Sequence, residues 1–184
     1  MNCNLFRGQL VRLAAQNSEA DAEAIARWSL DSEYWRLAHV MPARPRLAKE
    51  IREYLDRRPL EACWFAIRTV RDNQLIGDVG LFAIRWSQGE ASTGIGIGER
   101  TYWGQGYGTE AMRLLLRYAF TELNLQRISL SVLAGNGRAI RSYEKAGFIY
   151  EGRQQQIWSY DGQRLDEIHM GVLRQDWQAV NTVQ

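Results

Sequence analysis

Three glycines that alternate with larger residues stand directly before a helical pattern. Gly104, Gly106 and Gly108 lie in the segment YWGQGYGTEA. Glycine loses more conformational entropy on ordering than any other residue, so this spacing needs a reason. A helix N-terminus offers unpaired N–H groups and the positive end of the helix dipole, and small residues in front of it let an anion approach. The stretch indicates a main-chain site for a phosphate or pyrophosphate, or a tight turn that needs glycine only for its angles.

Two familiar nucleotide-binding loops do not match this segment. A Walker loop carries Lys followed by Ser or Thr after its last glycine, whereas Gly108 is followed by Thr109 and Glu110. A Rossmann fingerprint is G-x-G-x-x-G at the first strand of a βαβ unit, whereas this G-x-G-x-G run stands late in an antiparallel pattern. The sequence therefore argues against both classes of nucleotide-binding protein.

A second motif, NGRAIRSYEKAGF, begins at Asn136. Together with YWGQGYGTEA it resembles the GNAT superfamily of acetyl-CoA-dependent N-acetyltransferases. Within that superfamily it is similar to the branch of ribosomal-protein N-terminal acetyltransferases, with kinship to spermidine and aminoglycoside 6'-N-acetyltransferases. The resemblance is motif-specific from about Gly94 to Gly152 and rests elsewhere on the order of elements. It departs from the usual Arg or Gln at Trp103, although tryptophan is frequent there in this branch.

The resemblance implies a binding site for coenzyme A. Main-chain amides from Gln105 to Thr109 would hold the pyrophosphate, and the pantetheine arm would pair with residues 95–97 like an added strand. Asn136 would touch the pantetheine, cap the following helix, or do both. Arg138 and Arg141 would meet the nucleotide end or remain solvated. The implied cofactor-binding residues are Ile95, Gly96, Ile97, Trp103, Gly104, Gln105, Gly106, Tyr107, Gly108, Thr109, Asn136, Arg138 and Arg141, and no metal site is implied.

Acetyl transfer to an amine needs a neutral nucleophile, a stabilised oxyanion and a protonated leaving thiolate. By resemblance Tyr143 is the general acid, since a phenol titrates near 10 and still carries its proton at neutral pH. Its alternative role is that of a core aromatic. The oxyanion donor would be a backbone N–H near Ile97. Glu99 is the candidate for the base, with Glu90 and Asp78 nearby, and deprotonation through water would leave no trace in the sequence.

The elements expected around these motifs favour an α+β fold. We expect a mixed, mostly antiparallel sheet of about seven strands flanked by about four helices, and by resemblance a GNAT (acyl-CoA N-acyltransferase) fold splayed between the fourth and fifth strands. Ser18 is the expected N-cap of the first helix, and Asp161-Gly162 the turn of the last hairpin. Strands are expected at 7–15, 62–70, 74–84, 91–98, 127–134, 148–160 and 163–173, and helices at 18–30, between Pro45 and Pro59, at 109–123 and at 137–147.

Composition limits the partners. The 184 residues favour one GNAT domain over 1–184, and a net charge of +2 argues against nucleic acid or a membrane as the main partner. Cys3 and Cys63 form no disulfide framework, and the first residues lack a long apolar run, so a cytoplasmic protein is expected. The hairpin around Trp158 and Tyr160 could form a homodimer contact or a substrate lid.

The leading interpretation is transfer of acetyl from acetyl-CoA to a primary amine, on a protein N-terminus or a small molecule. A non-catalytic acyl-CoA sensor on the same fold is one alternative. Another is an aminoglycoside or polyamine acetyltransferase, although the acidic residues are not concentrated as such a cleft would require. Tyr34, Trp35 and His39 would line one wall of the acceptor cleft. His169 is expected to be an ordinary sheet residue, because no Ser-His-Asp grouping or metal-ligand spacing stands out.

Overall fold

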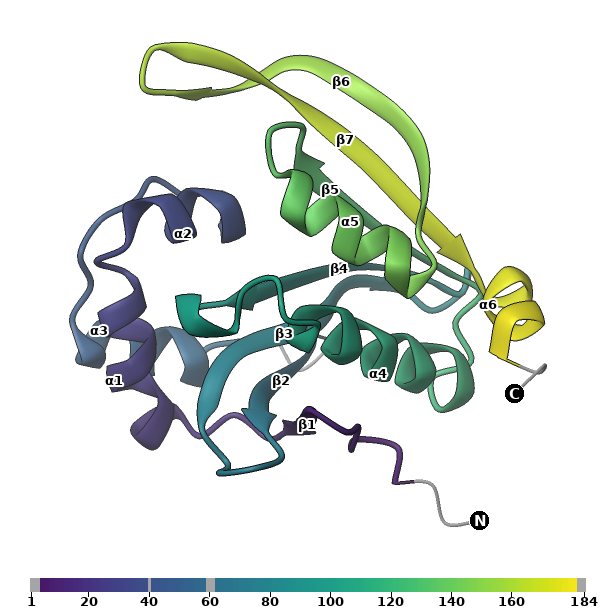
Figure 1. The fold of residues 1–184 in the computed structure, drawn as a ribbon, viewed down its shortest axis with the longest axis horizontal. Coiled ribbons are helices and arrows are strands. Elements are labelled where there is room, and N and C mark those ends of the chain that lie inside the picture. The colour runs from purple at the N-terminus through teal and green to yellow at the C-terminus, as the bar shows by residue number, and fades with distance from the viewer. Residues whose placement is uncertain (1–3, 40, 59–61, 182–184) are drawn as a thin grey trace.

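The computed structural model describes residues 4–39, 41–58 and 62–181. Within them the chain forms seven strands in one sheet, with helices around it (Figure 1). The order is β1 (Val11–Ala14), α1 (Ser18–Trp28), α2 (Ser32–Ala38), α3 (Ala48–Asp56), β2 (Cys63–Thr69), β3 (Leu75–Arg85), β4 (Glu90–Ile97), a 3₁₀ turn η1 (Arg100–Tyr102), α4 (Tyr107–Thr121), β5 (Arg127–Leu133), α5 (Gly137–Ala146), β6 (Ile149–Tyr160), β7 (Gln163–Leu173) and α6 (Arg174–Asn181).

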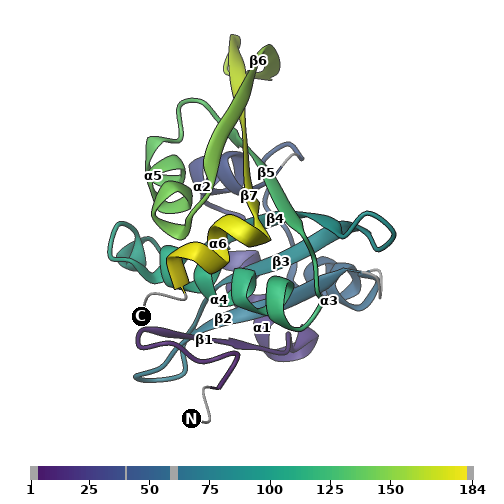
Figure 2. The same ribbon diagram turned by 90° about the vertical axis from the view of Figure 1, so that its right-hand side faces the viewer.

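The sheet is mixed and splayed, as predicted. Its strand order is β1-β2-β3-β4-β5-β7-β6, and β4 with β5 is the parallel pair. That ladder joins only residues 90–92 to residues 127–129, after which the two strands separate. In Figures 1 and 2 the β5-β7-β6 part of the sheet rises away from the β1–β4 part. Among the described residues, the edge of β4 beyond Ser92 therefore has no partner strand on the β5 side.

Helix α4 packs against one face of the sheet and forms the hydrophobic core there. Its predicted helical spacing is confirmed, because Met112, Leu115, Leu116 and Phe120 are all fully buried. Burying a side chain of this size contributes roughly 1.5–3 kcal/mol, so this face anchors the helix firmly. The strong packing fixes where the glycine-rich turn before α4 lies.

Helices α2 and α4 lie on opposite faces of β4. Successive side chains of a strand alternate between its faces. A methyl group added at Gly96 would meet Tyr34 and Ala38 of α2, whereas one added at Gly108 of α4 would meet Ile95 and Ile97. Any molecule in the gap beyond Ser92 can thus be reached from both faces of the sheet.

The structure differs from the sequence analysis at three helices. The N-cap of α1 is Asn17 rather than Ser18, because Asn17 has extended backbone and its side chain accepts from Glu19 N at 3.1 Å and Ala20 N at 3.0 Å. Helices α2 and α6 were not among the expected helices. With seven and eight residues, both are too short to show a clear apolar periodicity. None of the described helices is long and apolar enough to cross a membrane.

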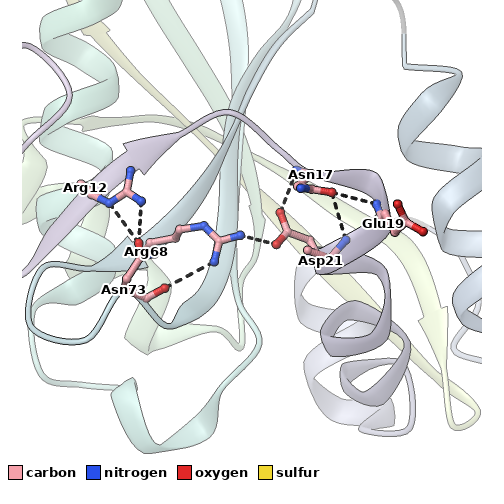
Figure 3. Close-up of polar contacts among 7 residues, drawn as sticks. Arg12, Asn17, Glu19, Asp21, Arg68 and Asn73 are labelled. Carbon is pink, nitrogen blue, oxygen red and sulfur yellow. Dashed lines mark hydrogen bonds and ion pairs between the residues drawn. The ribbon is translucent and has the colours of Figure 1, made fainter.

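A buried polar network attaches α1 to the sheet (Figure 3). Asp21, which is 2% exposed, accepts from the guanidinium of Arg68 on β2 and from the backbone N–H of Asn17 at 3.0 Å. Arg68 also donates to the carbonyl of Asn73 at 3.4 Å, and Arg12 of β1 donates to the Asn73 side chain at 3.1 Å. Two strands, one turn and the start of α1 are thereby joined.

The β6-β7 hairpin extends beyond the rest of the sheet and reaches toward α2 (Figure 1). Its predicted turn at Asp161-Gly162 is confirmed, with both residues at positive φ. The Asp161 carboxylate lies 2.7 Å from the guanidinium of Arg36 on α2. Trp158 donates to Glu167 at 2.8 Å within the hairpin, and the side chain of Tyr160 lies outside the described residues.

Candidate active site

A cavity of about 530 Å³ lies between β4, the turn before α4, and α5. It collects residues from both sequence motifs, which lie on opposite sides of the splay. The predicted cofactor-binding residues that line it are Ile95, Gly96, Ile97, Trp103, Gly104, Gly106, Gly108, Thr109, Asn136, Arg138 and Arg141. Tyr143 lines it as well.

Two of the predicted residues are not among those that line this cavity. The side-chain amide of Gln105 donates to the carbonyl of Thr101. The ring of Tyr107 packs edge to face on Tyr102, with centroids 4.8 Å apart. Both side chains therefore stabilise the turn by contacts within it. Each residue would bind a ligand through its main-chain N–H.

The turn itself leaves the start of α4 open. Gly104 and Gly106 have φ of 73° and 92°, in the left-handed region that costs other residues about 1–2 kcal/mol. Gly106 is the N-cap, and no side chain caps the helix. A methyl group placed on Gly104 would meet nothing within 4 Å. The first amides of α4 thus face open space, which fits a bound anion.

Four cations line the cavity around this helix end, namely Arg113, Arg138, Arg141 and Lys145. Their charge suits a ligand with several phosphates. Arg113 and Lys145 were missed by the sequence analysis, which named neither of them. Arg113 lies one turn after Thr109, and Lys145 one turn after Arg141, so helical spacing from the predicted residues could have found both.

The one carboxylate among the residues that line this cavity is hydrogen-bonded by backbone donors. Glu110 accepts from the main-chain N–H groups of Gln9 at 2.9 Å, Leu10 at 2.7 Å and Val11 at 2.7 Å. These bonds tie the segment before β1 to the first turn of α4. The carboxylate is thereby held in place at the start of α4.

Trp103 joins the two walls of the cavity. Its indole N–H donates to the carbonyl of Ile97 at 2.6 Å, at the end of β4. The guanidinium of Arg138, from α5, lies 3.3 Å from the centre of the Trp103 ring, and that of Arg100 lies 4.6 Å from it. The tryptophan that departs from the family pattern thus forms a cation–π contact across the splay.

Asn136 and Thr109 hold α5 in place. Asn136 caps α5 as predicted, since its side-chain oxygen accepts from Ala139 N at 3.2 Å, and it also lines the cavity. The hydroxyls of Thr109 and Ser142 are 2.8 Å apart and connect α4 to α5. The helix that carries Tyr143 is therefore fixed at its start and in its middle.

Tyr143 is buried, with 7% of its surface exposed, and packs against Phe148 with ring centroids 6.0 Å apart. Burial raises the pKa of Tyr143 to about 12, while nearby Arg138 acts in the opposite direction. Such a phenol keeps its proton throughout the neutral range. It is a weaker acid than a thiol of pKa near 8.5, so complete proton transfer to a thiolate would be uphill. The side chain is therefore suited to donate a hydrogen bond to a forming thiolate.

A second cavity of about 630 Å³ adjoins the first. Its walls come from the end of α2, from α3 and from β2 to β7, and it shares Ala38, Ile95 and Gly96 with the first cavity. The two cavities therefore meet over β4, just where the sheet opens. A molecule bound in one can reach a molecule bound in the other at this point.

The carboxylates that line the second cavity already have partners. Asp78 lies 3.0 Å from the guanidinium of Arg58, and Glu151 pairs with Arg127. Glu167 is the acceptor of the Trp158 indole N–H. Each of these three carboxylates thus already has a cation or a hydrogen-bond donor as its partner.

Both histidines of the chain, His39 and His169, line the second cavity. Nδ1 of His169 lies 3.1 Å from the hydroxyl of Ser131, and its Nε2 lies 3.7 Å from the Glu167 carboxylate. His169 is a sheet residue of β7, as expected, but the Ser131-His169-Glu167 group could not be foreseen because Ser131 belongs to another strand.

The candidate bases named from the sequence lie apart from each other. Glu99 binds the guanidinium of Arg27 and accepts from the Trp28 indole N–H at 2.9 Å, and it is not among the residues that line either cavity. Glu90 pairs with Arg85 at the far end of β4. Catalysis by Glu99 stays a prediction, and its carboxylate is already occupied by two partners.

Known proteins share this architecture and these motifs. Residues 12–149 match the family model described as an acetyltransferase (GNAT) domain. A Bacillus subtilis protein named "Probable N-acetyltransferase YjcK" is 38% identical over 130 residues, which are 70% of this chain and 71% of that protein. YdaF of the same organism, named as a candidate ribosomal N-acetyltransferase, is 28% identical over 69% of this chain and 66% of its own.

A similar fold is found in a solved structure of spermidine N-acetyltransferase from Vibrio cholerae, in complex with CoA and spermine. The TM-score is 0.80 at 23% identity, over 92% of this chain and 99% of that one. The Escherichia coli spermidine N(1)-acetyltransferase is 36% identical over 42% of each chain. With the family match and YjcK, these findings show that the chain belongs to the GNAT acetyltransferases, enzymes that use acetyl-CoA.

Proposed function

We propose that this enzyme acetylates a primary amine, on a protein N-terminus or a small molecule, by direct attack on acetyl-CoA. The observation that carries the proposal is the meeting of two cavities at Ala38, Ile95 and Gly96. One is lined by four cations and the open end of α4, and the other by polar and aromatic side chains. Their junction brings a thioester and an amine together without a covalent enzyme intermediate.

The chain's own groups supply the binding of acetyl-CoA. The uncapped amides of α4 would bind the pyrophosphate, and Arg113, Arg138, Arg141 and Lys145 would balance the phosphate charge. The pantetheine arm would lie along the unpaired edge of β4. These residues fit the group, because the helix end is open and the edge is free.

The chemistry then follows from position. The amine nitrogen forms a bond to the acetyl carbon while the carbon–sulfur bond breaks. A backbone N–H near Ile97 would stabilise the developing oxyanion. Tyr143 would donate a hydrogen bond to the sulfur as it leaves, and one proton lost by the nitrogen ends on that sulfur. The products are an N-acetyl amine and the free thiol of coenzyme A.

Polyamine acetylation is a second candidate, favoured by the spermidine acetyltransferases among the relatives. The carboxylates of the second cavity weigh against it, since Asp78 and Glu151 are already paired with arginines. A polycation would have to compete with Arg58 and Arg127 for them. We therefore expect a monoamine acceptor to be preferred over spermidine.

The test combines a binding and a turnover measurement. Coenzyme A is titrated into the protein by calorimetry, and thiol release from acetyl-CoA is followed with ribosomal N-terminal peptides, small monoamines, spermidine and an aminoglycoside. Binding with turnover of one amine class supports the proposal. Absence of binding refutes it, and binding without turnover of any amine assigns the chain to the sensor class instead.

A further inference from the structure

The acceptor amine must lose a proton before it can attack the thioester. The general bases that the sequence suggested, Glu99, Glu90 and Asp78, are all carboxylates already paired with arginine side chains. Imidazole is the side chain whose ordinary pKa lies near neutrality. The chain has two histidines, and both line the second cavity, where the acceptor would bind. The question is which of them, if either, lies where the amine meets the thioester.

His39 lies next to that point. It follows Ala38, one of the three residues shared by the two cavities, and ends α2 as its C-cap. Its ring stacks on Trp35 with centroids 3.9 Å apart and meets the edge of Tyr34 at 6.0 Å. The imidazole is therefore held in one orientation by two aromatic rings. Within the described residues, no hydrogen-bond partner binds its ring nitrogens.

His169 lies on β7, across the cavity from α2. Its Nδ1 already has the Ser131 hydroxyl as a hydrogen-bond partner at 3.1 Å, and its Nε2 lies 3.7 Å from the Glu167 carboxylate. Neither His169 nor its partners belong to the residues shared by the two cavities. This histidine is suited to contact the body of an acceptor rather than its reacting nitrogen.

The surroundings of His39 keep it neutral. Burial lowers its pKa from the ordinary value of 6.5, Asp78 on β3 acts in the opposite direction, and Arg46 and Arg58 lower the pKa further. Tyr34, the other titratable group packed against it, has a pKa raised well above its usual value by burial and stays uncharged. An unprotonated imidazole is thus available at pH 7.

We propose that His39 is the general base that takes the proton from the acceptor ammonium. This deepens the proposed function and rests on it. The proton passes from the ammonium nitrogen to the free imidazole nitrogen, and the resulting imidazolium releases it to solvent through the cavity. The neutral amine then attacks the thioester, and its second proton ends on the sulfur. Burial of the ammonium in the same cavity lowers its own pKa, which favours the transfer.

The test is the pH profile of kcat for H39Q, with H169Q as the matched variant from the opposite wall. In the wild type, kcat should rise with a pKa below about 6.5, the ordinary histidine value. H39Q should lower kcat by about 100-fold and lose this acidic limb, with the KM for acetyl-CoA changed less than about threefold. H169Q should keep the limb, whatever it does to the KM of the amine. Added imidazole should restore part of the activity of H39A.

An acidic limb that survives in H39Q would overturn the proposal, and its loss in E99Q would then assign the base to Glu99. If H39Q does not fold, an NMR titration of the wild-type histidines decides, because the pKa of His39 in the free enzyme must equal the pKa of the acidic limb of kcat/KM. A wild type that binds coenzyme A but acetylates no amine would refute the proposed function and this inference with it. An active wild type with an unchanged H39Q refutes this inference alone.

Discussion

Tyr143 is packed like a core aromatic and still lines the cavity proposed for coenzyme A. The two roles that its sequence position left open are thus compatible. Burial holds its pKa at about 12, so its proton is always present, and the same burial makes it a reluctant proton donor. In the proposed reaction, it would act through a hydrogen bond that strengthens as negative charge develops on sulfur.

Replacing Tyr143 by Phe should lower kcat by roughly 10- to 100-fold, because the phenol donor is lost while the ring packing stays. The KM for acetyl-CoA and the denaturation midpoint should change little. Steady-state kinetics with the best acceptor, beside a urea titration, would measure both. Unchanged kcat would reduce Tyr143 to a packing residue.

The coenzyme A side of the site was far more predictable than the acceptor side. Gly104, Gly106 and Asn136 stand in two contiguous motifs whose backbone geometry is local. The second cavity is assembled from eight helices and strands far apart in the sequence, and pairs such as Asp78 with Arg58 depend on how those elements pack. No local pattern reports such contacts, which is why the carboxylates looked equally available as bases.

At the scale of elements, α4 is an anchored helix with an open N-terminus. Its apolar face is fully buried, its first turn holds the segment before β1 through Glu110, and no side chain covers its first amides. The periodicity of α4 was visible in the sequence because its fifteen residues span four turns. The seven residues of α2 span only about two turns, so Tyr34 and Trp35 were expected in a connection rather than on a helix.

Substitution of Gly106 by Ala should weaken coenzyme A binding about tenfold, or ~1.4 kcal/mol. The position has φ of 92°, so a side chain there strains the turn that exposes the amides of α4. Gly135→Ala is the matched control, because a methyl group at Gly135 meets nothing within 4 Å and its φ is not in the left-handed region. Calorimetry with coenzyme A would compare the two, and equal affinities would argue against a main-chain phosphate site.

Across the whole molecule, α1 and α2 are tied to the sheet by one buried polar network and one exposed ion pair. The network of Asp21, Arg68 and Asn17 fixes α1, and the ion pair of Arg36 with Asp161 connects α2 to the tip of the β6-β7 hairpin (Figures 1 and 3). The splay leaves β4 and β5 joined over three residue pairs only. The geometry of the site therefore depends on contacts outside it.

Asp21→Asn should destabilise the fold by about 3 kcal/mol, because it leaves the guanidinium of Arg68 without its countercharge in a buried place. Glu19→Gln changes an exposed residue in the first turn of the same helix. It should lower the free energy of unfolding by less than about 0.5 kcal/mol. Urea denaturation of both variants gives the comparison. Equal midpoints would mean that α1 is held by its apolar contacts alone.

The contact of Arg138 with Trp103 has an optical consequence. Since the two side chains come from opposite walls of the splay, any molecule that threads between those walls must separate them or slide along the ring. Either event changes the polarity around one indole. Fluorescence emission of the wild type, set against W103F to subtract the other tryptophans, should therefore register cosubstrate entry on its own, before any acetyl group has moved.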